Sequence, residues 1–318
     1  MRRFGENKTY ITRDESSDEL IALTQASQVT QECENGAVGD NGMLGAGCVD
    51  PTDFHRSALL IGLKEEQTTG YNPIKLGVIA STDTHVSNPG NVKESDWAGS
   101  VVGEGTPVER LQKGILTSGI DGNPGGLAGI WAEQNTRDSI FNALLRKEVF
   151  GTSGPRIRPR FFAGWNINEN LCNVNEMISD AYASGVPMGG DLMPSRSKSF
   201  PKFLMHAAKD PEGLNIESIQ LVKGWIDEEG NMNTKVIPVL SEIGGAESLC
   251  KVYTDTEFEN SLPSYYYMRV VEPESPSWHT YDCKRLSEDD RPDVCTNKTY
   301  PSFIREMAWT SPIWYRPE

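Results

Sequence analysis

Residues 76 to 85 read Leu76-Gly77-Val78-Ile79-Ala80-Ser81-Thr82-Asp83-Thr84-His85, a short apolar run that ends in two potential metal ligands. A continuous apolar run of this length is typical of a β-strand that is buried on both faces, as in a parallel sheet. Functional side chains of parallel α/β folds gather beyond the carboxyl ends of the strands. The stretch therefore predicts a buried strand over 75–80 that delivers Asp83 and His85 to a site at its end.

Asp83 and His85 are the candidate metal ligands of this sequence. They are two positions apart, so an extended backbone would point both side chains to the same side. A carboxylate oxygen and an imidazole nitrogen are good ligands for zinc, manganese or iron. The alternative is that Asp83 caps a turn and His85 is a solvated loop residue, because this pair of residues also occurs by chance.

The segments around this stretch predict an α/β architecture. Apolar residues recur at helical spacing over 54–67 and again from about Thr136, and a second apolar run covers 126–132. The order helix, strand, loop, strand, helix indicates adjacent units of an α/β barrel. Residues 86–122 are rich in Gly, Asn, Ser and Pro, which predicts a long mobile loop placed as a lid over the site.

Two charged residues that follow the second apolar run are candidates for substrate binding. Glu133 comes directly after the predicted strand, where it would face the same pocket as Asp83 and His85. Arg137 lies in the first turn of the following helix and could bind an anionic substrate. The alternatives are a helix N-terminal carboxylate favoured by the helix dipole and an exposed helix arginine. The sequence identifies no general acid and no nucleophile.

The second half of the chain has a different pattern. Beyond Pro155, short segments with β-type alternation are separated by turn clusters, and Asp227-Glu228-Glu229-Gly230-Asn231 is typical of a hairpin turn. This half is predicted to form a β-rich, sandwich-like domain over 156–318, after a partial α/β barrel over 1–155. The predicted strands include 157–162, 203–207, 216–225 and 265–271.

The charge and hydropathy of the chain restrict the classes of partner. The formal net charge is −15, and an acidic surface repels phosphate backbones, so nucleic acid is not an expected partner. No apolar run approaches the roughly 20 residues that span a bilayer. Two arginines near the N-terminus are followed by no apolar stretch, so no secretory signal is recognised.

The six cysteines contain no Cys-x-x-Cys pair, which argues against a structural zinc site. Cys283 and Cys295 bracket a charged loop, and Cys33 and Cys48 bracket a glycine-rich one; loops closed in this way are typical of disulfides in exported proteins. Cys172 with Cys250 then follows by elimination. The alternative is six reduced thiols in a cytosolic protein.

Several stretches together resemble a known family. The run from Leu76 to His85 resembles the final motif of the PHP (polymerase and histidinol phosphatase) superfamily, in which an Asp-x-His pair closes a metal cluster. More closely, the chain is similar to a bacterial family catalogued as a domain of unknown function (DUF3604). The other matching stretches are 72–75, 123–126, 131–133, Thr152-Ser153-Gly154-Pro155-Arg156-Ile157, 185–192, Val222-Lys223-Gly224-Trp225 and 308–315.

The resemblance implies a distorted (β/α) barrel of the PHP type with a trailing β-rich domain. It also implies a metal site that begins with a His-x-His pair near the N-terminus. The chain departs from this pattern, because its histidines are His55, His85, His206 and His279 and no two of them form such a pair. We therefore expect the chain to be the C-terminal part of a longer protein that is exported to the periplasm or secreted. The alternative is a short paralogue that has lost catalysis.

The resulting functional hypothesis is a metal-dependent hydrolase of the PHP type. In the intact protein it would cleave a small phosphoester or a related ester, with divalent metal ions (zinc, manganese or iron) held by Asp83 and His85. The alternative is a non-catalytic fragment or binding protein that recognises a partner through its β-rich half.

Overall fold

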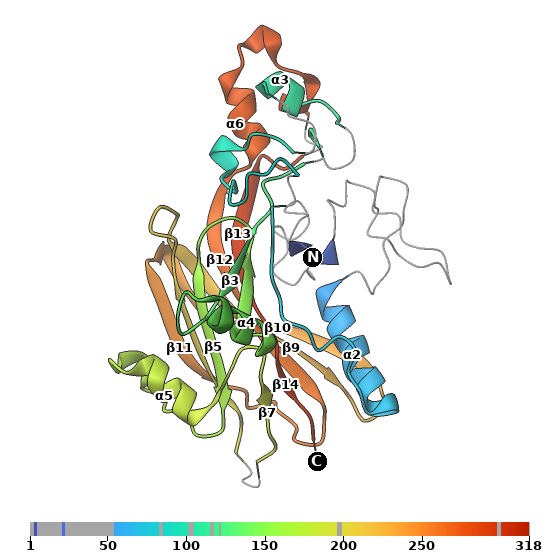
Figure 1. The fold of residues 1–318 in the computed structure, drawn as a ribbon, viewed down its shortest axis with the longest axis vertical. Coiled ribbons are helices and arrows are strands. Elements are labelled where there is room, and N and C mark those ends of the chain that lie inside the picture. Colours follow the sequence, from blue (N-terminus) through green and yellow to red (C-terminus); the bar gives the residue numbers. More distant parts are fainter. Residues whose placement is uncertain are drawn as a thin grey trace.

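The structure is a computed structural model that describes residues 3–4, 21–22, 54–82, 85–100, 105–114, 118–120, 122–195, 199–297 and 300–317. Within this part the chain is a mixed α/β protein with mostly antiparallel sheets and few helices (Figure 1). A two-stranded pair, β1 (Arg3–Phe4) with β2 (Ile21–Ala22), lies near the N-terminus. The remaining strands form a large sheet and a small sheet.

The large sheet has eight strands. Its main path runs β10-β9-β12-β13-β4-β3, and β14 joins β12 to β7. All its pairings are antiparallel except that of β14 with β7. The strands are β3 (Leu127–Ile130), β4 (Val149–Thr152), β7 (Asp191–Leu192), β9 (Ile216–Ile226), β10 (Met232–Ala246), β12 (Ser264–Pro276), β13 (Phe303–Thr310) and β14 (Ile313–Tyr315).

The small sheet has four antiparallel strands in the order β11-β8-β5-β6. They are β5 (Arg158–Gly164), β6 (Val186–Pro187), β8 (Lys202–Ala208) and β11 (Ser248–Thr254). These strands confirm the β-rich second half. The hairpin predicted at Asp227–Asn231 is also confirmed, because the Asp227 N–H donates to the Asn231 carbonyl and β9 pairs with β10 on either side.

The main hydrophobic core lies between the two sheets. Alternate residues of each strand point to this interface, as the period of a β-strand requires. Phe161 and Phe203 of the small sheet stack with ring centroids 5.8 Å apart, and Phe203 meets Tyr266 of the large sheet at 4.6 Å. All three rings are fully buried. The two sheets therefore pack face to face around this core.

The opposite face of the large sheet is covered by helix α2 (His55–Thr69). Leu59, Leu60 and Leu63 of this helix pack in one cluster with β9, β12 and β13 side chains such as Trp309. The helix ends at Gly70, which adopts φ 78° and donates its N–H to the Glu66 carbonyl. A left-handed glycine is a common way to end a helix, so the helix predicted over 54–67 is confirmed.

Smaller helices cover the outer surfaces of the sheets. Helix α4 (Arg137–Leu145) connects β3 to β4 and confirms the second predicted helix. Helix α5 (Met177–Ser184) and the 3-10 turn η4 (Leu171–Asn173) pack on the outer face of the small sheet. Helices α5 and α2 lie on opposite sides of the molecule, with the sheets between them (Figure 1).

One end of the molecule is built from α3 (Pro107–Arg110), α6 (Trp278–Arg285) and the 3-10 turns η3 (Glu94–Asp96), η5 (Glu288–Asp290) and η6 (Asp293–Cys295). Trp97, Leu111 and Ile120 pack there against Trp278 in a separate core cluster. Trp97 and Trp278 have ring centroids 4.4 Å apart. The region 86–122, expected to be a mobile lid, thus supplies buried anchors to this cluster; its mobility stays a prediction.

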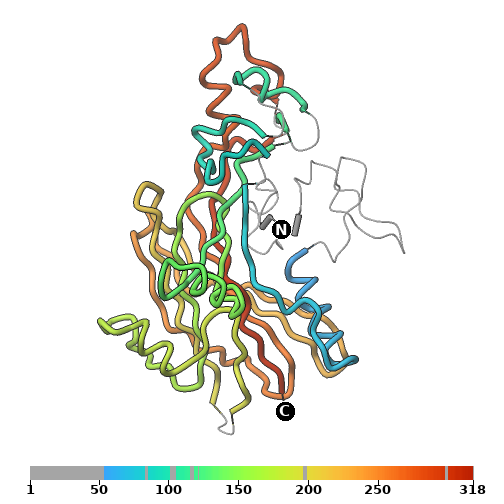
Figure 2. The backbone as a smooth tube through the Cα atoms, viewed as in Figure 1, coloured from blue at the N-terminus to red at the C-terminus, as the bar shows by residue number. Residues whose placement is uncertain are grey.

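The predicted barrel is not found. The described residues form no closed barrel, and residues 75–80, predicted to be a buried strand, are not in a strand. This segment runs alongside the large sheet after α2 (Figure 2), with Val78 and Ala80 buried and the Val78 N–H bonded to the Ser311 hydroxyl oxygen at 2.8 Å. A side chain thus satisfies the backbone group that a neighbouring strand would otherwise pair.

The pairing of β3 with β4, the strands on either side of α4, also differs from that of the predicted barrel. Two parallel barrel units would need a parallel crossover, but β3 and β4 pair antiparallel, from Leu127 with Thr152 to Ile130 with Val149. Strand β4 also pairs with β13. The large sheet therefore continues across the boundary expected between 155 and 156, and the division of the chain into two domains there stays a prediction.

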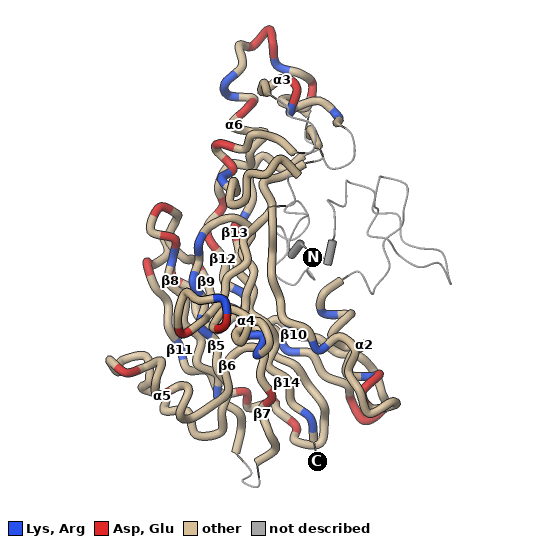
Figure 3. The backbone as a smooth tube through the Cα atoms, viewed as in Figure 1, with Lys and Arg blue, Asp and Glu red and all other residues tan. Residues whose placement is uncertain are grey.

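Charges are distributed unevenly over the surface. Acidic and basic residues are interspersed over the sheets, whereas three consecutive acidic residues form η5, Glu288–Asp290, beyond α6 (Figure 3). No helix within the described part of the chain has the length and apolar character needed to cross a membrane.

Two disulfides are present in the described residues. Cys283 pairs with Cys295 and Cys172 pairs with Cys250, as expected from the sequence. The third expected pair, Cys33 with Cys48, lies outside the described residues. Disulfides persist in oxidising compartments, so the two bonds fit an extracellular location.

We predict that the Cys283→Ser/Cys295→Ser double variant has a free energy of unfolding lower by about 3 kcal/mol. The bond closes a loop across a sequence separation of 12, and cross-links stabilise mainly by restricting the unfolded chain. Urea denaturation checks the shift, and free-thiol titration of the denatured, unreduced protein checks the pairing. Free Cys283 and Cys295 thiols after oxidative folding would show that the bond does not form.

Candidate functional site

Ser81 and Val92, which precede and follow Asp83 and His85 in the sequence, both lie beside the end of β4. Before the motif, the Ser81 carbonyl accepts a hydrogen bond from the Gly126 N–H at 3.0 Å. Gly126 lies so close to the Thr152 carbonyl that a Cβ there would stand 1.9 Å from it. After the motif, a Cβ on Gly154 would stand 3.0 Å from the Val92 carbonyl oxygen. Both attachments therefore flank the Thr152-Ser153-Gly154 stretch singled out in the sequence.

The structure describes one of the two predicted metal ligands, His85. Asp83 lies outside the described residues. His85 is exposed and adopts φ 56°, so the extended backbone expected to align the two side chains does not hold at His85. A left-handed conformation is uncommon for a residue with a side chain, and such residues gather at functional sites. No group of three or more His, Cys, Asp or Glu within the described ranges is arranged to hold a metal ion.

Buried carboxyl groups lie at the same end of β4. The Ser153 hydroxyl donates to the Glu306 carboxylate and accepts from the Met307 N–H at 2.8 Å. Glu272 is 2% exposed, and burial, followed by the nearby Glu306 and Asp210, raises the pKa of its carboxyl to about 8. Glu272 is therefore protonated at neutral pH. The Ser153-Gly154 motif was the only sequence signal for this group.

The pKa of the nearby Asp210 is shifted in the opposite direction from that of Glu272. Burial alone would raise its pKa, but hydrogen bonds from the backbone N–H groups of Arg156, at 2.8 Å, and Glu212, at 3.0 Å, favour the charged form, and the pKa of Asp210 is lowered. Hydrogen bonds to a carboxylate act in this direction. The buried carboxyl groups near Ser153 thus include a neutral acid, Glu272, and an ionised carboxylate, Asp210.

Glu133 and Arg137 lie elsewhere. Glu133 follows the C-terminal end of β3, whereas Gly126, which holds Ser81, precedes the N-terminal end of the same strand. Glu133 lines a cavity of about 560 Å³, and Arg137 is exposed and does not line it. The structure places Glu133 in a cavity, but it does not bring Glu133 together with His85. A substrate contact by either residue stays a prediction.

The wall of the Glu133 cavity is a set of paired charges that the sequence did not reveal. Glu148 is buried and accepts hydrogen bonds from Tyr182 and, at 3.4 Å, from Arg146. Arg160 lies 3.3 Å above the centre of the Trp131 ring, a cation–π arrangement. Burial, together with the bond to Glu148, raises the pKa of Tyr182 to about 12. Because these charged groups are paired with one another, they contribute mainly to the shape of the cavity wall.

The fold and these sites define a mixed α/β protein built on two packed sheets, with buried carboxyl groups near Ser81 and Val92, described residues that flank the Asp-x-His motif. The chain belongs to the family described as Protein of unknown function (DUF3604), whose model matches residues 41–241 and 238–317. Comparisons with curated proteins and with solved structures found no significant match.

Proposed function

We propose that the protein is a metal-dependent hydrolase of the PHP type, in which Asp83 and His85 are two of the metal ligands. The observation that carries the proposal is that Ser81 and Val92, which precede and follow the two ligands in the sequence, both lie beside Thr152–Gly154. Membership of the DUF3604 family supports it, because the residues matched by the family model, 41–241 and 238–317, include Asp83, His85 and the segments that flank them.

The donor types fit a divalent transition metal. Carboxylate and imidazole groups bind zinc, manganese and iron. A hydrolytic site usually has at least three protein ligands and one open position, so Asp83 and His85 need at least one further ligand from residues that the structure does not describe or from another part of the intact protein. A metal bound there would supply an activated water near neutral pH and stabilise developing negative charge.

The substrate class we propose is a small phosphoester or a related ester. The buried acid Glu272 and the Ser153–Glu306 pair lie at the end of β4 that also holds the loop. They are candidates to hold protons near that end of the sheet. We further propose a periplasmic or secreted location for the protein, supported by the two disulfides.

A second candidate function is a non-catalytic binding protein that uses its β-rich half. One observation favours it: this half contributes to two cavities whose walls combine aromatic and charged side chains, including Trp225 with Glu259 and Trp131 with Arg160. The two candidates differ in whether metal uptake depends on Asp83 and His85, so comparing the metal uptake of the unmodified chain with that of the alanine variants separates them.

The proposal predicts that metal content and ester hydrolysis depend together on Asp83 and His85. The chain is stripped with a chelator and reloaded with Zn²⁺ or Mn²⁺, and metal per chain is measured by elemental analysis beside hydrolysis of an aryl phosphate ester. Because two ligands hold a divalent ion weakly, we expect low occupancy in the 318-residue chain. A longer form that supplies further ligands should bind metal stoichiometrically, and Asp83→Ala or His85→Ala should remove both metal and activity.

Asp96→Ala serves as the matched control for this prediction, since Asp96 is an exposed carboxylate in the neighbouring turn η3. It should leave metal content and hydrolysis unchanged. Full activity in both the Asp83→Ala and the His85→Ala variants of the longer form would refute the assignment of the site.

A further inference from the structure

The motif Val222-Lys223-Gly224-Trp225 is not explained by the proposed hydrolase site. It lies in the last part of β9, where successive side chains point to opposite faces of the large sheet. Val222 packs in the cluster beneath α2, and Gly224 leaves room for the Tyr265 ring, which a Cβ would approach to 2.3 Å. Lys223 and Trp225 therefore point to the other face.

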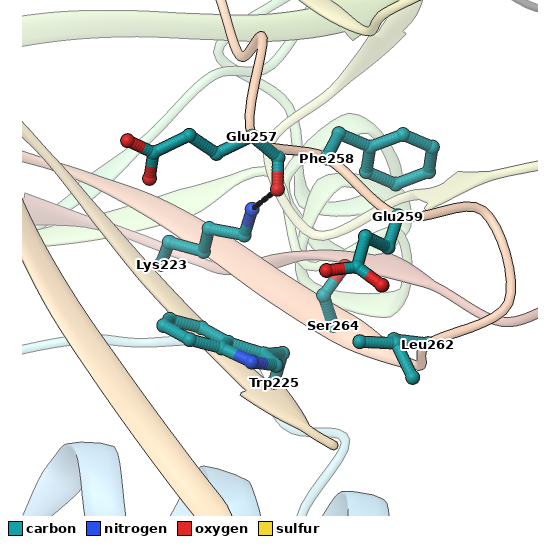
Figure 4. A pocket seen from close by; sticks show the side chains of 7 residues that line it. All are labelled: Lys223, Trp225, Glu257, Phe258, Glu259, Leu262 and Ser264. Atoms are coloured by element: carbon teal, nitrogen blue, oxygen red, sulfur yellow. Dashed lines mark hydrogen bonds between the residues drawn. The ribbon is translucent and has the colours of Figure 1, made fainter. Parts of the chain in front are cut away.

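Lys223 and Trp225 form the walls of a cavity of about 170 Å³ at one end of the sheets. The cavity is closed by the loop after β11, which contributes Glu257, Phe258, Glu259 and Leu262. In Figure 4 the Trp225 ring lies below the Lys223 side chain, and Glu259, Ser264 and Leu262 stand on the opposite side of the space. The motif thus supplies two of the groups that line this cavity.

Lys223 is held in place by buried partners. Its ammonium donates to the Asp255 carboxylate at 2.7 Å and to the Glu257 carbonyl at 3.0 Å. Asp255 is 1% exposed and also accepts from the Tyr266 hydroxyl at 2.8 Å. An ammonium group has three donors, so these bonds leave the third N–H of Lys223 for a group in the cavity.

The charges around the cavity determine which ligands it can accept. Lys223 pairs with Asp255 at 2.7 Å, and Lys235 pairs with Glu257 at 2.5 Å. Glu259 has no cationic partner among the described residues and keeps a negative charge at the rim. This charge disfavours an anionic ligand, and a cation on the Trp225 ring would meet the Lys223 ammonium, which lies 5.4 Å from the ring centre.

We propose that this cavity is a binding site for one neutral sugar ring. A hydroxyl group both donates and accepts hydrogen bonds, so adjacent hydroxyls can donate to Glu259 and accept from Lys223. The apolar face of the ring then lies on Trp225, which lines the cavity and is partly exposed. A cavity of about 150 Å³ holds a benzene ring, so the observed volume is on the scale of one six-membered ring. The site is independent of the proposed hydrolase function.

The test is a titration of the full chain with neutral hexoses, namely glucose, galactose, mannose and N-acetylglucosamine, followed by tryptophan fluorescence and by saturation-transfer NMR. We expect at least one of them to bind, and glucuronate, the carboxylated analogue, to bind about tenfold more weakly. Binding of none of these hexoses, or equal binding of glucuronate, would overturn the proposal. Preferential binding of tetramethylammonium would also overturn it, since the cavity would then select cations.

Variants locate the binding in this cavity. Glu259→Gln, at an exposed position, should weaken binding of the preferred hexose about tenfold because a charge-assisted hydrogen bond is lost. Trp225→Leu should abolish binding, and Trp225→Phe, which keeps an aromatic face, should restore part of it. Glu229→Gln, an exposed change in the adjacent hairpin, is the control and should have no effect. Unchanged affinity in Glu259→Gln and Trp225→Leu, with circular dichroism showing both folded, would place the sugar elsewhere and reject the site.

Discussion

Replacing Asp282 by alanine should lower the free energy of unfolding by about 3–5 kcal/mol. Asp282 of α6 binds Arg110 of α3 through two hydrogen bonds, of 2.7 and 3.1 Å, and also Arg285 at 2.7 Å. The side chains of Asp282 and Arg110 are only 2% and 8% exposed. Removing the Asp282 carboxylate takes two charge-assisted hydrogen bonds from the buried Arg110 guanidinium, which is the costly way to break a buried ion pair.

Two comparisons show whether the buried charge causes this loss. The Arg110→Met/Asp282→Leu double variant removes both charges and should recover most of the stability. Glu212→Ala breaks the exposed Lys93–Glu212 pair, with side chains 63% and 65% exposed, and should cost less than about 1 kcal/mol. Urea denaturation measures all three. An Asp282→Ala loss as small as that of Glu212→Ala would contradict the structural role of the pair.

The stability of the protein should fall as the pH rises from 5 to 9, and Glu272 should be a main cause. Its pKa is raised to about 8 in the folded protein, first by burial and then by Glu306 and Asp210, with Lys209 opposing. A raised folded-state pKa means that the folded state binds the proton more tightly than the unfolded chain. The contribution is therefore complete below the unfolded pKa of about 4.5 and is lost as the pH rises through 8.

Glu272→Gln carries a neutral amide in the place of the protonated acid and should remove this dependence. At pH 9 the variant should be more stable than the unmodified protein by about 3–5 kcal/mol, the order expected for such a shift, whereas near pH 5 the two should differ little. Glu274→Gln, at an exposed position of the same strand, is the control. Parallel stability profiles for the Glu272→Gln variant and the unmodified protein from pH 5 to 9 would show that Glu272 is not perturbed.

Local patterns in the sequence were sufficient for the helices and for much of the β-structure. Helical spacing of apolar residues predicted α2 and α4, and the polar turn Asp227–Asn231 predicted the β9–β10 hairpin. These features depend on neighbours within a few positions. The strand predicted over 75–80 is wrong because only Val78 and Ala80 are buried, Leu76 is exposed, and the Val78 N–H bonds to the Ser311 side chain, more than 230 positions away.

The candidate site shows the same division. The Asp83–His85 motif and the Thr152–Gly154 stretch are visible in the sequence, but the contacts that bring Ser81 and Val92 beside Thr152–Gly154 involve Gly126 and Gly154, which the sequence does not connect to them. The raised pKa of Glu272 depends on burial and on two carboxyl groups from other strands and turns. Nothing in the sequence indicates that Trp97 anchors the region 86–122 against Trp278, because a single tryptophan in a polar stretch forms no periodic pattern.

The central claim, that Asp83 and His85 share a metal ion, is tested most directly by titrating Zn²⁺ into the chain and following the imidazole NMR signals of its four histidines. His55 and His279 are buried and His206 is partly buried, so they are internal controls for the exposed His85. The account predicts that the His85 signals shift first and that Asp83→Ala raises the zinc concentration required by about tenfold or more, whereas Asp96→Ala does not. A His85 response that begins no earlier than that of His206, or that is unchanged in Asp83→Ala, would contradict the claim.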